Sequence, residues 1–504
     1  MATRLVTARV WADAGFGQAP EQCPGVLSEP PARTAVCFSG GGTRSMVASI
    51  GQLRALQALG LLDRVGYLSC VSGSAWAAVP FVFAPDGLAR LGTPTAPEAL
   101  TRSALDTVPA ESLLHPATIW FKDAFGGLDA DPEVAPGDVW IRAVGQTFLA
   151  PSDLHALDHS VGCAPGVDAG ELSDVPRLRM GAGAPFPVIH ATVNWPGQRS
   201  EHQHRVPFEQ TPLYAGVPQR HTLPVVTGEE RVVGGTLIEA AAGGCCAPEA
   251  GVDSDGRAIV LPAARPWSLA SMLGATSAFN TPDRDERAYP RVRTWAMPGP
   301  DGGPDPVDDM LTDGGDVDTL SLHGMLRRGV RKLVVCLNSV WPVDLDHDPT
   351  GWPDPGQIDP ALPPLFGQSS LRWPHNQVFP PSAYVDLVRG LQRARRNGRP
   401  LVVDTHAPLV DHAWWGSEGG GDVSIVWVYN SRVREWDQRL LDEVRQLLPT
   451  GDEEGPLARF PHYRTIGQNP GALTRLTPLQ ANLLCELAAW SVLSSEEMVR
   501  SLLA

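Results

Sequence analysis

The sequence predicts an α/β fold, in which short apolar strands lead through tight turns into helices. The first such unit is an apolar strand at Thr34–Phe38, followed by a glycine-rich segment and a stretch with apolar residues at helical spacing. The second is an apolar strand at Tyr67–Val71, followed by Ser72 and by small and apolar residues at 73–81 that are typical of a buried helix. Both units place a sharp turn, and not a long loop, between strand and helix.

The residues at these two turns indicate a chemical role. The first reads Ser39-Gly40-Gly41-Gly42-Thr43-Arg44. Glycines there let the backbone turn tightly and leave N–H groups unpaired at the helix N-terminus. The second reads Cys70-Val71-Ser72-Gly73-Ser74, and a serine on such a turn holds its hydroxyl out from the sheet. In this order, the two segments predict an oxyanion hole and a nucleophilic serine.

A third segment, Asp313-Gly314-Gly315, follows Met310-Leu311-Thr312 and precedes a helix-like stretch and an apolar strand at 333–337. Each segment alone is weak evidence, because the chain contains 51 glycines and has a second glycine triplet at 419–421. The ordered combination of the three is much more specific.

Together, the three segments resemble the motifs of the patatin and cytosolic phospholipase A2 superfamily of serine lipid acyl hydrolases, nearer its cytosolic phospholipase A2 and phospholipase B branch. The family pattern is Ser-Gly-Gly-Gly-x-Arg, then Gly-x-Ser-Gly-Ser, then Asp-Gly-Gly or Asp-Ala-Gly. The resemblance implies a patatin-like three-layer α/β/α fold with a mostly parallel central sheet and several insertions. It also implies the following site: Ser72 as nucleophile, Asp313 as its base, Gly40, Gly41 and Gly42 as the oxyanion hole, and Arg44 as an anion-binding residue for substrate.

One position departs from the family pattern, because Cys70 stands where the family has the first glycine of the serine turn. Cysteine is small, so we expect the turn to be kept. Shorter matches to the same branch extend the resemblance beyond the three motifs; they lie at 138–140, 187–192, 208–214 and 268–279.

In the implied dyad, an aspartate acts where histidine usually acts. Histidine has a pKa of about 6.5 and aspartate of about 3.9, but partial burial raises the pKa of a carboxylate. A histidine triad is the alternative, because the chain order Ser…Asp…His is that of α/β-hydrolases. The candidates after Asp313 are His323, His347, His375, His406, His412 and His462. The glycine-flanked aspartate and the glycine-to-arginine loop favour the dyad.

Length and motif spacing predict one large catalytic domain. The 504 residues exceed the usual size of a single domain, but no clear linker separates the motifs. We expect an N-terminal extension at 1–30 and a catalytic domain at 31–504, with insertions at about 86–184 and 341–385 that are rich in Pro, Gly and Asp. The C-terminal part should complete the sheet, with an apolar strand at 423–428, helical spacing at 434–448, a capping box at 477–480 and a last helix after 494–497.

Composition limits the partners. A net charge of −16 argues against binding to nucleic acid and against purely electrostatic docking on anionic lipid. Residues 1–10 lack the apolar core of a secretory signal, and the eight cysteines show neither metal-binding spacing nor a disulfide framework. We expect Cys37, Cys70, Cys336 and Cys485 to be reduced core residues, and Cys245-Cys246 to carry no site. These features predict a cytoplasmic protein without a cofactor.

Two smaller features of composition carry further expectations. Lysine occurs only at 122 and 332, which is typical of a GC-rich coding sequence and predicts a bacterial source. The uncharged stretch at 65–85 is long enough for a membrane helix, but it coincides with the serine turn and is better explained as a buried strand-turn-helix unit.

We therefore expect a calcium-independent serine acyl hydrolase that acts on acyl esters of phospholipids or lysophospholipids in membranes or micelles, with peripheral contact and no transmembrane segment. The alternatives are a serine esterase or acyltransferase with a non-lipid substrate, and a catalytically inactive interaction module. The aromatic cluster at 113–125 and Trp414-Trp415 are candidates for a lid or for ordinary core packing. The acidic stretch at 301–309 lacks the ligand spacing of an EF-hand loop.

Overall fold

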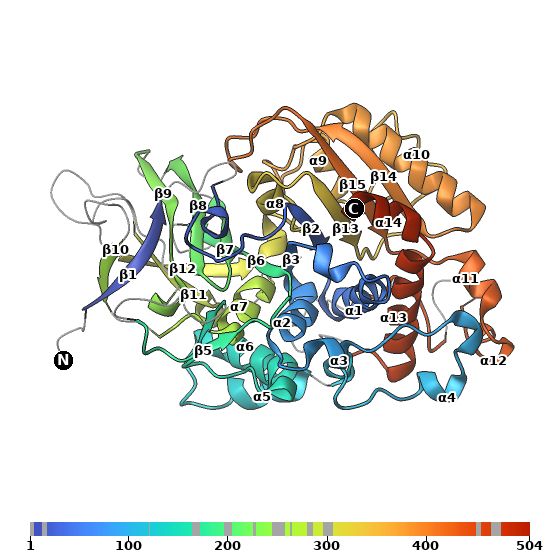
Figure 1. Ribbon diagram of the computed structural model, residues 1–504, viewed down its shortest axis with the longest axis horizontal. Coiled ribbons are helices and arrows are strands. Elements are labelled where there is room, and N and C mark those ends of the chain that lie inside the picture. The colour runs from blue at the N-terminus through green and yellow to red at the C-terminus, as the bar shows by residue number, and fades with distance from the viewer. Residues whose placement is uncertain are drawn as a thin grey trace.

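The computed structural model of the chain contains one large sheet with helices on both faces, shown in Figure 1. It describes residues 5–12, 18–119, 121–163, 172–195, 204–224, 228–243, 258–262, 265–279, 286–295, 306–449, 455–464 and 475–504.

Parallel strands form the centre of the sheet. Their spatial order is β6 (Phe186–Trp195), β3 (Tyr67–Val71), β2 (Thr34–Phe38), β13 (Lys332–Leu337) and β15 (Asp422–Tyr429). Nearly all of their residues are buried, as parallel strands covered on both faces require. The predicted α/β fold with its parallel centre is confirmed, and β2 and β3 begin and end where the sequence predicts.

Antiparallel strands extend the sheet on both sides of this centre. β14 (Leu401–Pro408) pairs with β15 at one edge. At the other side, the order from β6 outward is β7 (His204–Gln210), β8 (Tyr214–Pro224), β9 (Glu230–Glu239), β1 (Leu5–Ala12) and β10 (Ala258–Pro262). Figure 1 shows β1, β9 and β10 at the end of the molecule opposite α10. The N-terminal segment thus contributes a strand to the sheet.

Different helices cover the two faces of the sheet. Phe38 and Cys70 point into the core of one face, together with apolar residues of α1 (Gly42–Ala58), α2 (Ala75–Phe83), α7 (Leu269–Ser277) and α13 (Pro478–Leu493). Cys37 and Val335 point into the other core, together with residues of α8 (His323–Arg327), α9 (Leu362–Leu365) and α10 (Pro381–Asn397). Successive strand residues point to opposite faces, so Cys37 and Phe38 belong to different cores. This is the three-layer α/β/α arrangement that the resemblance implies.

The C-terminal helices complete one of these layers. A methyl group on Gly51 of α1 would lie 2.1 Å from the carbonyl oxygen of Cys485, so glycine permits the close approach of α13. α13 begins with the predicted capping box, in which Thr477 and Gln480 each bind the backbone N–H of the other. α14 (Glu496–Leu503) follows it. The helical stretch at 434–448 forms two short helices, α11 (Arg434–Arg439) and α12 (Asp442–Arg445), because the backbone at Leu440 is extended.

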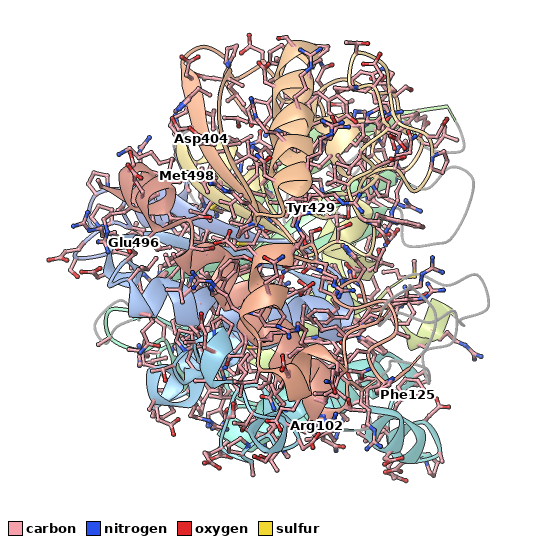
Figure 2. The ribbon with its side chains drawn as sticks, turned by 90° about the vertical axis from the view of Figure 1, so that its right-hand side faces the viewer. Arg102, Phe125, Asp404, Tyr429, Glu496 and Met498 are labelled. Carbon is pink, nitrogen blue, oxygen red and sulfur yellow. The ribbon has the colours of Figure 1, made fainter. Side chains whose placement is uncertain are left out.

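The first predicted insertion forms small helices: α3 (Gly87–Leu91), α4 (Arg102–Leu105), α5 (Phe121–Asp129) and α6 (Pro136–Val144), with a two-stranded sheet of β4 (Ser160–Gly162) and β5 (Arg177–Arg179). Leu113, Leu114 and Phe121 of the predicted aromatic cluster are buried in the core. Phe125 is half-buried near the edge of the molecule in Figure 2, and Trp120 lies outside the described residues. Ile119 is exposed, so the described part of the cluster is divided between core and surface.

Among the described residues, no helix combines the length and the apolar character needed to cross a bilayer. The uncharged stretch at 65–85 contains β3, a 3₁₀ turn at Ser72–Ser74 and α2. Cys37, Cys70, Cys336 and Cys485 are buried free thiols, whereas Cys245 and Cys246 lie outside the described residues.

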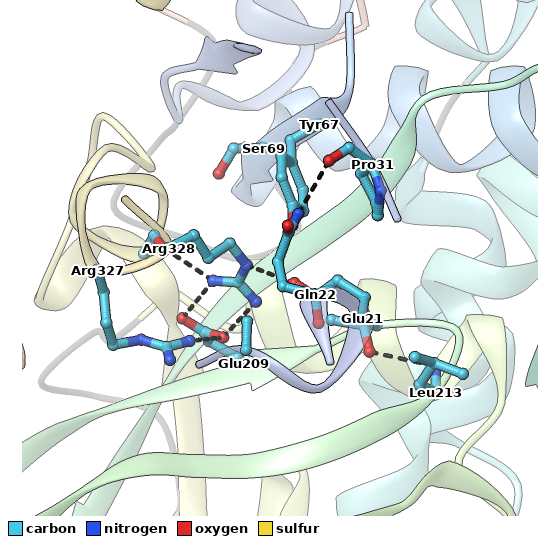
Figure 3. Close-up of polar contacts among 12 residues, drawn as sticks. Glu21, Gln22, Pro31, Tyr67, Ser69, Glu209, Leu213, Arg327 and Arg328 are labelled. Carbon is cyan, nitrogen blue, oxygen red and sulfur yellow. Dashed lines mark hydrogen bonds and ion pairs between the residues drawn. The ribbon is translucent and has the colours of Figure 1, made fainter. Parts of the chain in front are cut away.

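A buried network of charges ties the N-terminal segment to the sheet, as Figure 3 shows. Arg328, which follows α8, donates from Nε to Glu21 at 2.8 Å and from Nη1 and Nη2 to Glu209 of β7 at 3.1 and 2.8 Å. Arg327 donates to the same Glu209 carboxylate at 2.7 Å. All four side chains are at most 3% exposed, so the network belongs to the core.

Candidate active site

Strand β6 brings the predicted serine and aspartate together. β3 runs parallel to the first half of β6 and ends with Val71 opposite His190. β12 (Pro306–Asp313), which also pairs with β11 (Arg291–Trp295), runs antiparallel to the second half of β6 and ends with Asp313 opposite Ala191. The ends of β3 and β12 therefore meet at adjacent positions of one strand.

At this meeting point, Ser72 Oγ donates a hydrogen bond of 2.6 Å to Asp313 Oδ2. The other carboxylate oxygen, Oδ1, accepts the N–H of Gly315 at 2.8 Å. Thr192 of β6 donates to the backbone carbonyl of Asp313 at 2.9 Å. Ser72 is 5% exposed and Asp313 is 8% exposed, so the pair lies in a largely water-free environment.

Ser72 has a backbone conformation that non-glycine residues rarely adopt, with φ at 56°. Its N–H donates to Thr276 Oγ1 at 2.8 Å, and the Thr276 hydroxyl donates to the carbonyl of His190 at 2.5 Å. Thr276 of α7 thus links the strained turn to β6. Cys70 keeps regular strand pairing and is fully buried, so the departure from the family glycine leaves the turn intact.

The glycine loop lies against the same turn. Gly41 and Gly42, at the start of α1, have φ values of 141° and 59°, which glycine adopts without strain. Among the described residues, no acceptor pairs with the Gly42 N–H. The Gly40 N–H, in contrast, donates to the carbonyl of Thr319 at 2.9 Å. This differs from the expectation for Gly40, because an N–H engaged in the fold is not available to an oxyanion.

Arg44 also differs from its expected role. Its side chain is buried, with Nε donating to the carbonyl of Asn338 at 2.8 Å and Nη1 to the carbonyl of Tyr463 at 2.7 Å. Burial lowers the pKa of Arg44 to about 10, so the guanidinium remains charged at neutral pH. A buried guanidinium bonded to backbone carbonyls braces the glycine loop, and this geometry does not present it to a substrate phosphate.

The environment of Asp313 favours its action as a base. Burial raises the pKa of Asp313 to about 7, while the hydrogen bond from Ser72 opposes the shift and the negative charge of Asp316 adds to it. A carboxylate with a pKa near 7 is far more basic than an exposed aspartate and matches neutral working pH.

None of the six histidines that follow Asp313 forms a hydrogen bond with Ser72 or Asp313 among the described residues. Each instead has other partners. His323 bonds to Asp318 and Asn376, His347 to Tyr384, His406 to Ser424, and His462 to the carbonyl of Ser339. His375 lies against Trp414, and the backbone N–H of His412 bonds to Ser417.

The described residues also contain no group of three or more His, Cys, Asp or Glu side chains able to hold a metal ion. Most of the acidic stretch at 301–309 lies outside them.

Residues 34–222 match the family model of the lysophospholipase catalytic domain. This match covers less than half of the chain and supports an assignment to the patatin and cytosolic phospholipase A2 superfamily. Mouse and human cytosolic phospholipase A2 zeta are each 64% identical to the chain over 42 residues, which are 8% of this chain and 5% of the relative. Mouse cytosolic phospholipase A2 gamma is 58% identical over 43 residues, or 7% of its length. These alignments therefore span only a small part of the curated relatives.

Solved structures of human GIVD cytosolic phospholipase A2 are also similar. One has a TM-score of 0.45 at 13% identity and covers 95% of this chain and 64% of that chain. Another, in complex with methyl gamma-linolenyl fluorophosphonate, has a TM-score of 0.38 at 13% identity and covers 93% of this chain and 59% of that chain. The curated relatives above are mammalian, and the bacterial source remains a prediction.

The superfamily motifs point to Ser72 and Asp313 but not to the residues that hold them. Thr276 and Thr192 secure the two turns, and Trp373 Nε1 donates to the carbonyl of Gly315 at 2.9 Å. Thr276 lies within the predicted match at 268–279. Thr192 lies within the predicted match at 187–192. Nothing in the sequence marks Trp373 as a neighbour of the site, because its contact depends on the fold.

Proposed function

We propose that the chain is a serine lipid acyl hydrolase that cleaves acyl esters of phospholipids or lysophospholipids through a Ser72–Asp313 dyad. The 2.6 Å hydrogen bond between Ser72 Oγ and Asp313 Oδ2 carries the proposal. It joins a serine on a strained strand-to-helix turn to a carboxylate whose pKa is raised to about 7.

In the first half of the reaction, Ser72 Oγ attacks the carbonyl carbon of the ester while Asp313 takes the hydroxyl proton. The negative charge that develops on the carbonyl oxygen is stabilised by backbone N–H groups of the Gly41–Gly42 loop. Loss of one such donor typically costs about 2.7–4 kcal/mol in the transition state. The ester C–O bond then breaks, Asp313 gives its proton to the leaving alcohol, and the acyl group remains on Ser72.

In the second half, Asp313 takes a proton from a water molecule that attacks the acyl-enzyme. The bond to Ser72 Oγ breaks, the proton returns to Oγ, and the fatty acid is released. The same carboxylate thus acts as base, then acid, then base and then acid again, for which a pKa near 7 is well matched.

The lipid nature of the substrate rests on the superfamily and on the lysophospholipase domain match at 34–222. Ser72 is 5% exposed, so side chains around it have to move before an acyl chain reaches Oγ. We further propose that the protein works in the cytoplasm and contacts membranes or micelles peripherally. A non-lipid esterase would instead prefer short soluble esters over micellar lipid.

Labelling by a fluorophosphonate probe tests the nucleophile. We expect the wild-type protein to be labelled and to hydrolyse phospholipid in micelles. Ser72→Ala should lose the label and at least about 10³-fold of kcat while its circular dichroism spectrum stays unchanged. Ser103→Ala, which changes an exposed serine in α4, is the matched control and should keep both the label and the hydrolytic activity. A folded Ser72→Ala protein that still hydrolyses lipid would contradict the proposal.

The same assay separates dyad from triad. Asp313→Asn should be as inactive as Ser72→Ala, whereas single changes at the six histidines should leave most activity in every variant that folds. A folded histidine variant as inactive as Ser72→Ala would show that a triad operates instead.

A further inference from the structure

A pocket of about 330 Å³ opens beside the turn that follows Asp313. We name it the turn pocket; its walls include His204, Arg205, Asp316, Arg372, Trp373 and Trp414. Its volume lies at the lower end of the range for small-molecule sites, about 300–1,000 Å³. A compact polar ligand therefore fits it better than a long acyl chain.

The turn pocket and Asp313 share one short piece of backbone. Gly315 donates its N–H to Asp313 Oδ1 at 2.8 Å and accepts the indole N–H of Trp373 at 2.9 Å. Asp316, the next residue, lines the pocket. The pocket wall at Asp316 is therefore three residues from the proposed base in sequence, although Ser72 and Asp313 do not themselves line the pocket.

Asp316 lines the pocket with a carboxylate that is only partly paired. It is 6% exposed, and its Oδ1 lies 3.5 Å from Arg372 Nη2. Its Oδ2 is buried and has no hydrogen-bond partner in the part of the chain that the structure describes. A buried carboxylate oxygen without a donor is costly, so the site favours a ligand that brings an N–H or O–H group.

Two guanidinium groups supply positive charge at the same walls. The Arg372 side chain is 56% exposed, and its guanidinium lies 4.7 Å from the centre of the Trp373 ring. Arg205 lies on β7 and is half-buried. A guanidinium binds a phosphate through paired hydrogen bonds and keeps its charge at any working pH.

The aromatic side chains do not form an open cage for a quaternary ammonium group. Such groups bind over free aromatic faces. Here Trp414 is in ring contact with His375 and His221, each at 4.1 Å, and Trp415 is stacked on His323 at 4.2 Å. A trimethylammonium group also has no N–H to offer Asp316, whereas a primary ammonium has three.

We propose that the turn pocket binds a phospholipid head group that carries a phosphate and a primary ammonium, as phosphoethanolamine does. The phosphate binds Arg205 and Arg372, and the ammonium donates to the carboxylate of Asp316. This inference rests on the proposed hydrolase function, because it names the head group of that substrate.

Binding of soluble head groups tests the pocket without requiring catalysis. Isothermal titration calorimetry of the wild-type protein should show that phosphoethanolamine binds at least about tenfold more tightly than phosphocholine or inorganic phosphate, the effect of one hydrogen bond to a charged group. Asp316→Asn should abolish this difference, and Asp404→Asn, an exposed change on β14, should keep it. Equal binding of the three ligands, or no binding of phosphoethanolamine, overturns the proposal.

Hydrolysis gives the second readout. We expect kcat/KM in mixed micelles to be about tenfold higher for phosphatidylethanolamine than for phosphatidylcholine with the same acyl chains. The ratio should fall towards one in Asp316→Asn. Arg372→Gln should lower turnover of both phospholipids relative to p-nitrophenyl butyrate, and Arg393→Gln on α10 should not. A ratio near one in an active wild-type enzyme overturns the head-group proposal. Failure to hydrolyse any ester contradicts the proposed function instead, while the calorimetry still decides the pocket.

Discussion

The surroundings of Asp313 determine how basic its carboxylate is. An exposed aspartate is too weak a base to activate a serine at neutral pH, but burial raises the pKa of Asp313 to about 7. Asp316 adds to this shift through its negative charge. The residue that lines the turn pocket therefore also tunes the proposed base.

The pH dependence of hydrolysis should report this tuning. Because the base acts in its deprotonated form, kcat/KM for p-nitrophenyl butyrate should rise with pH through about 7 and level off above it. Asp316→Asn removes a negative charge and should move the midpoint to lower pH, whereas Asp404→Asn should not move it. A wild-type midpoint near pH 4 would contradict the role assigned to burial.

At this scale, the sequence motifs predict the Ser72–Asp313 pair that we propose as the reacting residues, but they do not predict which contacts the neighbouring residues make. Arg44 has the position and charge of a phosphate ligand, and only the fold brings the carbonyls of Asn338 and Tyr463 to it. Gly40 likewise belongs to a glycine triplet, yet its N–H meets Thr319 from a distant part of the chain. A local pattern does not reveal which of its groups are already engaged by residues far away in sequence.

At the scale of elements, α7 holds the strained turn against β6. The hydroxyl of Thr276 both accepts from the Ser72 N–H and donates to the His190 carbonyl. A φ of 56° at a serine costs of order 1–3 kcal/mol and persists only where the surrounding structure enforces it. Thr276 is therefore a positioning residue for Ser72.

Thr276→Val should reveal this role, because valine has nearly the shape of threonine but its side chain neither accepts nor donates a hydrogen bond. We expect the free energy of unfolding to fall by about 1–3 kcal/mol and kcat to fall more than KM changes. Thr276→Ser retains the hydroxyl and should restore both in urea unfolding and steady-state kinetics. If the serine variant fails as the valine variant does, the methyl group and not the hydroxyl is what matters.

Elements with strong local signals were predicted well. Apolar runs fixed the positions of β2 and β3, and the box at Thr477 fixed the start of α13. The division of β6 between β3 and β12 was not predicted, because strand pairing depends on which distant segments share an edge. The turn pocket was not predicted for the same reason, because its walls come from four separate parts of the chain.

At the scale of the whole molecule, the network around Glu209 joins the N-terminal segment, β7 and the end of α8. Burial alone would raise the pKa of Glu209, but the guanidinium groups of Arg327 and Arg328 lower it well below its usual value. Because the pKa of Glu209 is lower in the folded state than in the unfolded state, ionised Glu209 stabilises the fold at pH values above its unfolded pKa. This contribution is lost as pH falls below about 4.5.

Glu209→Gln should therefore lower the free energy of unfolding at pH 7 by about 3–5 kcal/mol, because two buried guanidinium groups lose their shared partner. The difference from the wild type should shrink as pH falls below 4.5. Glu496→Gln on α14, labelled in Figure 2, removes an exposed ion pair with Arg500 and should have little effect in the same urea titrations. A Glu209 effect that does not depend on pH would contradict the assigned role of its charge.

The pairing of β3 and β12 with β6 determines the distance between Ser72 and Asp313, whereas the length of the chain between β6 and β12 does not. Ser72 and Asp313 are 241 residues apart in sequence, yet their spacing is set by the adjacent positions of His190 and Ala191. Insertions between the end of β6 and the start of β12 leave that spacing untouched, and each doubling of a flexible loop costs only about 0.6 kcal/mol. A single residue inserted between His190 and Ala191 would instead move the two side chains apart by about 3.3 Å, beyond hydrogen-bond reach.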